Sequence, residues 1–210
     1  MPSHVLVSLL GWPVHNEAEN LARRSTRVSA NFLGQEHPNT LASMVNLASI
    51  YSDHGRWMEA EELDVNVMET RKEVLGQDHP DTLISMANLA STYRDQGRWK
   101  EAEELEVDVV ETSKGVLGQD HPFTLASMSN VAATYSNQGR WKEAEELDVK
   151  VMEARKGVLG QDHPGTLSSM ANLASTYRDQ GRWKGNSFPC ESFSPLACSV
   201  LGVFGVFGAA

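Results

Sequence analysis

Hydrophobic side chains recur through most of the chain at the spacing of an α-helix. Between residues 82 and 96 they stand at i, i+3, i+4, i+7 and i+10, namely Leu83, Met86, Ala87, Ala90 and Tyr93. This spacing lines one face of a helix. A second apolar stripe predicts another helix over residues 99–114: Trp99, Ala102, Leu105, Val109 and Val110. Gly97 ends the first helix, and the short link after it makes the two helices antiparallel.

This helix pair belongs to a unit that repeats along the chain. The run Gly-Gln-(Asp/Glu)-His-Pro starts at Gly34, Gly76, Gly118 and Gly160, so each step is 42 residues. A fixed period of this length is typical of a repeat array. We assign the array to residues 16–184 and divide it into five parts: a degenerate half-repeat 16–33, full repeats 34–75, 76–117 and 118–159, and a truncated repeat 160–184.

Two segments flank the array. Residues 1–15 form a helix-like or strand-like apolar run and are a candidate cap for the first helix. Residues 185–210 are apolar and of low complexity, and the run from Leu196 is shorter than the roughly 18–20 residues of a membrane span. We expect this tail to be disordered. The alternatives are a cap on the last helix, a membrane anchor and a binding segment.

Small and aromatic residues recur where the predicted helices meet. Alanine at a helix crossing permits close approach of the two backbones, and large rings fill the space beside it. We therefore assign twelve residues to the structural core: Ala48, Tyr51, Trp57, Ala60, Ala90, Tyr93, Trp99, Ala102, Tyr135, Trp141, Ala144 and Tyr177. Pro80 suits the first turn of its helix, with His79 or Asp78 as the capping residue.

These motifs carry a resemblance to a known family. The pattern Asn88-Leu89-Ala90-x-x-Tyr93-x-x-x-Gly97-x-Trp99-x-x-Ala102 resembles a tetratricopeptide repeat. The runs LGQDHPDTL, NLASTY, QGRW and EAEEL resemble the kinesin-light-chain type, which has 42-residue units and also occurs in fungal and bacterial NACHT or NB-ARC signalling proteins. The resemblance covers about residues 16–184. It implies an all-α, right-handed solenoid of antiparallel helix hairpins, with the first helix of each hairpin on the concave side.

The charge and the cysteine content indicate which classes of partner and which cell compartment suit this chain. The formal net charge is −10, whereas nucleic acids and anionic membranes attract clustered lysine and arginine. We therefore expect neither as a partner. Both cysteines, Cys190 and Cys198, lie in the tail, so no disulfide framework holds the array, and a reducing, cytoplasmic setting fits best. The N-terminal apolar run has no basic flank, which disfavours a signal peptide.

The sequence offers little for catalysis or for a bound metal or cofactor. One histidine per repeat precedes a proline, at His37, His79, His121 and His163. Successive hairpins lie on the order of 10 Å apart, so these imidazoles cannot share one zinc, whose ligands lie about 2 Å from it. The glutamate runs 59–62, 101–104 and 143–146 fall in first turns on a solvent face. We expect no enzyme activity and no cofactor.

Polar side chains form ladders on the first helices, which are the candidate binding surface. Asn46, Asn88, Asn130 and Asn172 supply one amide per repeat, and an amide can bind the main chain of an extended peptide. The other candidate peptide-binding residues are Ser91, Arg94, Asn137 and Arg178. An arginine here can bind a carboxylate in a bidentate pair. The alternatives are that each asparagine bonds to a neighbouring helix and that each arginine pairs with the adjacent aspartate.

The sequence therefore predicts a non-catalytic module that binds a peptide or protein segment on the concave face. A second hypothesis is a fragment of the sensor array of a nucleotide-binding signalling protein. A third is self-association, because the fourth copy breaks off after Lys184 and leaves its first helix, over residues 166–180, without a partner. We expect four residues of that helix to be partly exposed: Leu167, Met170, Ala174 and Tyr177.

Overall fold

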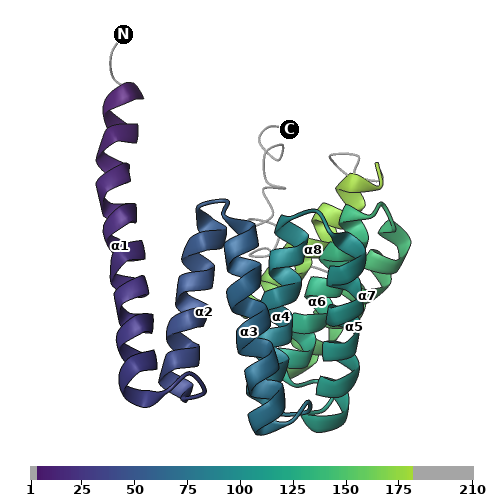
Figure 1. Ribbon diagram of the computed structural model, residues 1–210. Helices are drawn as coiled ribbons and strands as arrows, with labels where there is room; N and C mark the ends of the chain where they lie inside the picture. Colours follow the sequence, from purple (N-terminus) through teal and green to yellow (C-terminus); the bar gives the residue numbers. More distant parts are fainter. Residues whose placement is uncertain (1–3, 182–210) are drawn as a thin grey trace. The chain divides into compact units, whose positions relative to one another are not determined.

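The computed structural model describes residues 4–181, with side chains from Glu17 onward. Within this range the regular structure is α-helical throughout (Figure 1). The helices are α1 (His4–Leu33), α2 (Pro38–Asp53), α3 (Trp57–Leu75), α4 (Pro80–Asp95), α5 (Trp99–Val116), α6 (Pro122–Asn137), α7 (Trp141–Leu159) and α8 (Pro164–Asp179). The all-α class that the sequence predicts is confirmed. The expected tail, 185–210, lies outside the described residues.

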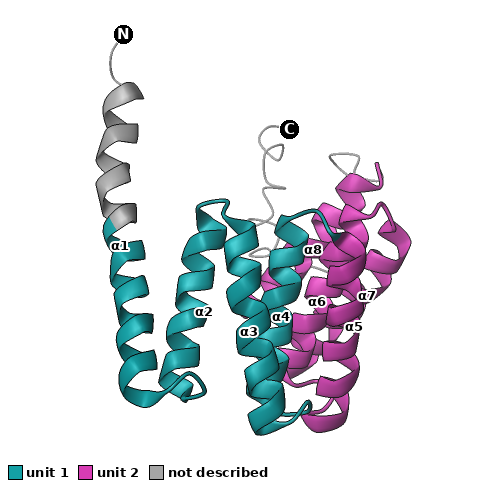
Figure 2. Ribbon diagram, viewed as in Figure 1, with its two compact units in different colours: residues 1–98 teal, residues 99–210 magenta. Residues whose placement is uncertain are grey.

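The helices group into two compact units, residues 1–98 and residues 99–210 (Figure 2). In the first unit, α1 packs on α2, α2 on α3, and α3 on α4. In the second unit, α5 packs on α6, α6 on α7, and α7 on α8. Helix α1 includes most of residues 1–15 together with the half-repeat assigned to residues 16–33. Each unit is thus a row of helices joined by short turns.

The His-Pro dipeptides start the first helix of each repeat. His37, His79, His121 and His163 are the N-caps, and Nδ1 of each accepts a hydrogen bond from the backbone N–H two residues later, at 3.0–3.2 Å. Capping the free N–H groups of a first turn stabilises the helix. The predicted cap at position 79 is therefore the histidine and not Asp78.

A threonine closes the turn before each of these helices. Thr82 Oγ1 donates to the carbonyl oxygen of Gly76 at 2.8 Å, and the threonine side chain is fully buried. Thr40, Thr124 and Thr166 make the same bond to Gly34, Gly118 and Gly160. Gly76 has a φ of +93°, a backbone conformation that residues with a Cβ avoid. The Gly and the Thr of each Gly-Gln-(Asp/Glu)-His-Pro-x-Thr run thus fix one turn together.

The Gln-Gly-Arg-Trp link ties each hairpin to the second helix before it. Arg98 Nη1 lies 2.8 Å from both carboxylate oxygens of Glu61, and its guanidinium stacks 4.1 Å from the centroid of the Tyr93 ring. Gln96 Nε2 donates to the same carboxylate at 2.8 Å. In the second unit Arg140, Glu103 and Tyr135 repeat this arrangement. At the start of the array, Arg56 reaches Glu19 and Tyr51 in the same way.

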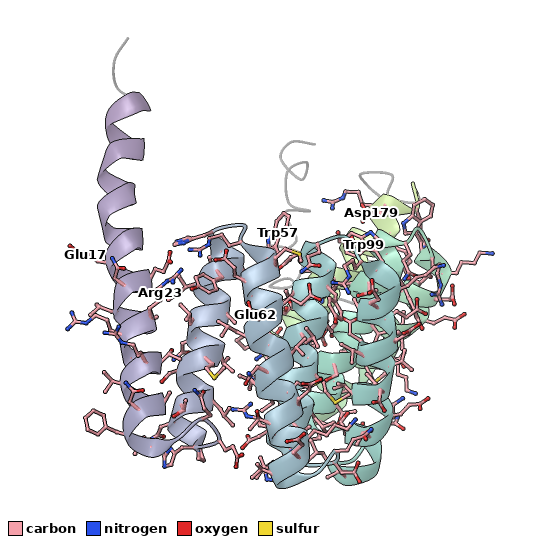
Figure 3. The ribbon with its side chains drawn as sticks, viewed as in Figure 1. Glu17, Arg23, Trp57, Glu62, Trp99 and Asp179 are labelled. Atoms are coloured by element: carbon pink, nitrogen blue, oxygen red, sulfur yellow. The ribbon has the colours of Figure 1, made fainter. Side chains whose placement is uncertain are left out.

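Helix α1 thereby receives the same arginine contact as a second helix of a full repeat, although His54 stands where later links have glutamine. The pKa of Glu19 is lower than that of an ordinary glutamate, mainly because Arg56 donates a hydrogen bond to its carboxylate. Arg23 of α1 (Figure 3) donates a hydrogen bond to Glu19 at 2.8 Å and lies 5.3 Å from the centroid of the Tyr51 ring. Glu19 thus gives Arg56 the same kind of acidic partner that Glu61 gives Arg98.

The alanines assigned to helix contacts are buried, but two tryptophans differ from the expectation. Ala48, Ala60, Ala90, Ala102 and Ala144 are at most 2% exposed, and Tyr51 is also buried. Trp57 and Trp141 are 41% and 40% exposed, so they are not core residues. Each begins a second helix at the end of a hairpin, where neighbouring helices cover only part of the ring. Trp99, Tyr93, Tyr135 and Tyr177 are half-buried.

The last helix, α8, shows part of the exposure expected for a helix without a partner. Leu167 is half-buried, whereas Leu41, Leu83 and Leu125 at the same repeat position are at most 4% exposed. Met170 and Ala174, by contrast, are buried at 1% and 8% exposure. The expectation is wrong for these two residues, which are buried in a helix that packs on α7. Self-association through this helix stays a prediction.

Candidate functional site

A polar groove of about 400 Å³ lies in the first unit, between the first helices of two successive repeats. Its lining comes mainly from α2 and α4, and α3 supplies one residue. The lining residues are Val45, Asn46, Ser49, Ser52 and Asp53 from α2, Asp64 from α3, and Asn88, Ser91, Thr92 and Asp95 from α4. Three of the predicted peptide-binding residues, Asn46, Asn88 and Ser91, are therefore brought together on one surface.

Helical spacing and the repeat period place these side chains side by side. On α2, Asn46, Ser49 and Asp53 stand at i, i+3 and i+7, which puts them on one face of the helix. On α4, Asn88, Ser91 and Asp95 occupy the equivalent positions, 42 residues further along. Both helices pack against α3, so the two polar faces flank the same groove.

The asparagine amides in the groove are available to a ligand. Asn46 is exposed and Asn88 is half-buried. Across residues 17–181, neither side chain forms a hydrogen bond with another part of the chain. Each amide presents two donors and one acceptor oxygen. The alternative in which each asparagine bonds to a neighbouring helix does not occur at these two positions.

Asp64 forms the buried part of the groove. Its side chain is only 5% exposed, and Thr92 Oγ1 of α4 donates a hydrogen bond to its Oδ2 at 2.7 Å. Burial raises the pKa of Asp64 to about 6, and the hydrogen bond from Thr92 acts in the opposite direction. The Asp64 carboxyl group is therefore ionised in most molecules at pH 7.5, but it takes up a proton at a higher pH than an exposed aspartate does.

The sequence reasoning missed this buried acid–threonine pair, although it recurs with the repeat. In the second unit, Thr134 donates to Glu106 at 2.6 Å and Thr176 donates to Asp148 at 2.7 Å. Burial also raises the pKa of Asp148. The two members of each pair are 28 residues apart in the sequence. One repeat earlier, both positions are apolar, Ala22 and Ile50. The two positions are thus apolar together in one repeat and polar together in the next. This joint change is the sequence signal that could have revealed the pair.

The other predicted binding residues lie in the second unit or beside the groove. Asn130 is half-buried on α6 and Asn172 is exposed on α8. Asn137 Nδ2 donates to the carbonyl of Ala133 at 3.0 Å. Arg178 reaches Ser175 at 2.9 Å and Asp179 at 3.5 Å, which is the predicted alternative for this arginine. Arg94 of the first unit contacts Ser91 Oγ at 3.4 Å.

A second hollow, of about 440 Å³, lies in the second unit and has an apolar floor. Val110 of α5, Met128 and Val131 of α6 and Leu147 of α7 line this floor. Met68 and Met152 occupy the position of Val110 in the neighbouring repeats. Val110 is therefore the smaller side chain at this repeat position.

The described residues contain no cluster of three or more His, Cys, Asp or Glu side chains placed to hold a metal ion. The imidazole Nδ1 of each His-Pro pair accepts a backbone hydrogen bond at a helix N-terminus. Within residues 4–181, no helix is both long and apolar enough to cross a membrane.

Comparisons with known proteins place the fold. The family model described as tetratricopeptide repeat matches residues 44–115 and 123–184. One solved structure holds the nearly identical TPR-like repeats of a Podosopora anserina protein described as a kinesin light chain. It is 32% identical to this chain with a TM-score of 0.69, and the match covers 90% of this chain and 84% of that one. A variant of that protein gives a TM-score of 0.71 at the same identity and coverage.

More distant structures share the fold alone. BtubC (BKLC) from P. vanneervenii is 17% identical with a TM-score of 0.70, over 93% of this chain and 76% of that one. The apo form of RapI is 13% identical with a TM-score of 0.65, over 82% of this chain and 61% of that one. No curated protein sequence matches significantly. The family model and the 32% identity to kinesin-light-chain-like repeats show that this chain belongs to the tetratricopeptide repeat family.

Proposed function

We propose that the chain is a non-catalytic interaction module that binds an extended peptide segment of a protein partner along its first helices. Tetratricopeptide repeats are typical scaffolds for protein–protein interaction, and their members are generally not enzymes. One observation supports a binding role for this chain in particular. Asn46 and Asn88 lie 42 residues apart in one groove, and their amides bond to no other part of the described structure.

The groove matches the requirements of an extended main chain. A peptide backbone carries a donor and an acceptor at each residue, and these groups need partners when a protein surface covers them. The two amides can supply such partners from opposite sides of the groove, on α2 and α4. Ser49 and Ser91, one helical turn further along, add a hydroxyl from each side.

The experiment that tests this function compares one double variant with a matched control. Peptides are selected from a random nine-residue display library on the full chain, and their affinities are measured by fluorescence anisotropy. Asn46→Ala/Asn88→Ala should weaken binding by roughly tenfold, because one hydrogen bond contributes about 0.5–1.5 kcal/mol. The control is Asn66→Ala, which removes an exposed amide from α3 outside the groove lining.

The result separates this function from its alternatives. Helicity by circular dichroism should be the same in all variants, since alanine favours helices. The proposal fails if the library yields no peptide, or if the selected peptides bind the double variant as tightly as they bind the wild-type chain.

A further inference from the structure

The groove in the first unit carries carboxyl groups that no basic side chain neutralises. Asp53 on α2 and Asp95 on α4 are exposed, and Asp64 lines the same groove from α3. In the described part of the chain, none of the three forms an ion pair with a lysine, arginine or histidine. This distinguishes them from many other acidic residues of the chain. Glu19, Glu59, Glu61, Glu103 and Glu143, for example, each pair with an arginine.

Asp64 shows that the groove is more than an acidic patch on a helix surface. Its side chain is 95% buried, yet it borders the groove. Thr92 bonds to Oδ2 only, and Oδ1 has no hydrogen-bond partner among residues 17–181. A buried carboxylate without a neighbouring cation destabilises the folded chain unless it is protonated. A cation that enters the groove would remove this destabilisation.

The equivalent positions of the second unit differ in charge. Asn137 stands where the first unit has Asp53. Asp179, which is equivalent to Asp95, lies 3.5 Å from Arg178. Asp148 keeps its buried position and its bond from Thr176. The set of three carboxyl groups without a basic partner is therefore a feature of the first unit and not of the repeat in general.

We infer that the groove between α2 and α4 selects peptides that place a lysine or arginine side chain between Asp53 and Asp95, with its charged end at Asp64. This inference rests on the proposed function and specifies the chemistry of the partner. Val45 supplies apolar surface for the aliphatic stem of such a side chain, and the carboxylates bind its charged end. Asn46 and Asn88 remain available to the peptide backbone.

The direct test uses peptides of defined sequence and one buried-site variant. Nine-residue peptides from the selection above are synthesised in four versions. The versions carry lysine, arginine, glutamine or glutamate at the position where a basic residue is most frequent among the selected peptides. Their affinities for the full chain are measured at pH 7.5 in 50 and 300 mM salt. The variant is Asp64→Asn, in which the amide oxygen can still accept the hydrogen bond from Thr92. The control is Glu62→Gln, which makes the same change in charge at an exposed position of α3.

The lysine or arginine peptide should bind at least tenfold more tightly than the glutamine peptide, and the glutamate peptide should bind most weakly. Asp64→Asn should abolish the preference for the basic residue, and Glu62→Gln should keep it. Higher salt should reduce the preference, because it screens charges near the surface. Equal affinities for the four peptides, or a preference that survives in Asp64→Asn, would overturn the inference.

The two proposals fail in distinguishable ways. If the peptides bind regardless of charge and Asn46→Ala/Asn88→Ala weakens them, the proposed function stands and the basic preference is wrong. If the double variant does not weaken them, both proposals are wrong. Arg94 contacts Ser91 beside the groove, so a preference for the glutamate peptide would assign the recognition to this arginine and also overturn the inference.

Discussion

Thr92 of α4 donates a hydrogen bond of 2.7 Å to the buried carboxyl group of Asp64 on α3. This bond joins the second helix of one repeat to the first helix of the next. It also positions an acidic group below the groove that holds Asn46 and Asn88. The pair thus links the packing of successive repeats to the surface that we propose as the binding site.

Removal of the threonine hydroxyl should destabilise the first unit. Thr92→Val leaves the Asp64 carboxyl buried without this hydrogen bond, which costs about 1–3 kcal/mol. The free energy of unfolding is measured by urea denaturation followed by circular dichroism. The double variant Asp64→Ala/Thr92→Ile reproduces the apolar pair Ala22 and Ile50 of the preceding repeat. This double variant should be more stable than Thr92→Ile alone, because it has no buried carboxyl group without a partner. Equal losses of stability in the two variants would contradict an energetic coupling between Thr92 and Asp64.

The buried carboxyl of Asp64 predicts a specific pH dependence of stability. Burial raises its pKa to about 6 in the folded chain, so between about pH 4 and pH 6 the folded state binds a proton that the unfolded state does not bind. Stability from this group therefore rises as the pH falls from 7.5 to 5, by about 1 kcal/mol. Asp53 on α2, Asp95 on α4 and the nearby Arg94 are the other charged groups around the groove.

The matched variant isolates this contribution from the other titrating groups. Asp64→Asn cannot ionise, so its stability should change less between pH 7.5 and 5 than that of the wild-type chain. It should also be more stable than the wild type at pH 7.5. Identical pH profiles for the two proteins would show that Asp64 keeps an ordinary pKa.

The arginine of the hairpin link should contribute to the packing between repeats. Arg98→Ala removes the ion pair with Glu61 and the contact with the Tyr93 ring. We expect a loss of about 1 kcal/mol, because both groups are partly exposed. Lys100→Ala, at an exposed position two residues later, is the control. A double-variant cycle with Glu61→Gln measures the coupling, and a coupling energy of zero would contradict this role.

The hollow in the second unit predicts a stabilising substitution. Val110→Met introduces the residue found at the same position in the neighbouring repeats, as Met68 and Met152. Filling a cavity commonly raises stability by about 0.5–2 kcal/mol. The change should therefore raise the urea midpoint and leave peptide affinity unchanged, because the groove lies in the other unit. A lower midpoint would mean that the floor of this hollow cannot accept the longer side chain.

Much of the fold could be predicted because the repeat presents each local signal several times. The helical spacing, Gly97 at the hairpin link and Pro80 in a first turn are local features, and they predict the hairpins and their starts closely. The sequence left two candidates for the cap, His79 and Asp78. Only the structure decides between them, because it shows that the imidazole Nδ1 of His79 accepts the backbone hydrogen bond. The exposure of Trp57 could not be predicted, because it depends on how far neighbouring helices extend.

The candidate site was only partly predictable for a similar reason. The asparagine ladder follows from the repeat period on one helix face. Asp64 is on a different helix from Asn46, and its burial depends on the packing of α3 between α2 and α4. In the sequence, Asp64 stands close to other acidic residues that we expect to be exposed. Sequence reasoning therefore favours an exposed position for Asp64 as well. Its partner Thr92 is 28 residues away, so no local pattern connects the two.

The central claim is that a peptide binds in the groove between α2 and α4, and site-directed photo-cross-linking tests it most directly. A benzophenone amino acid is placed at Ser49, which lines the groove, or at the exposed Asn66 of α3, which does not. The full chain is irradiated with a selected peptide, and the products are mapped by mass spectrometry. We predict efficient cross-linking from position 49 and little from position 66. Equal yields from the two positions, or a higher yield from position 66, would contradict the account.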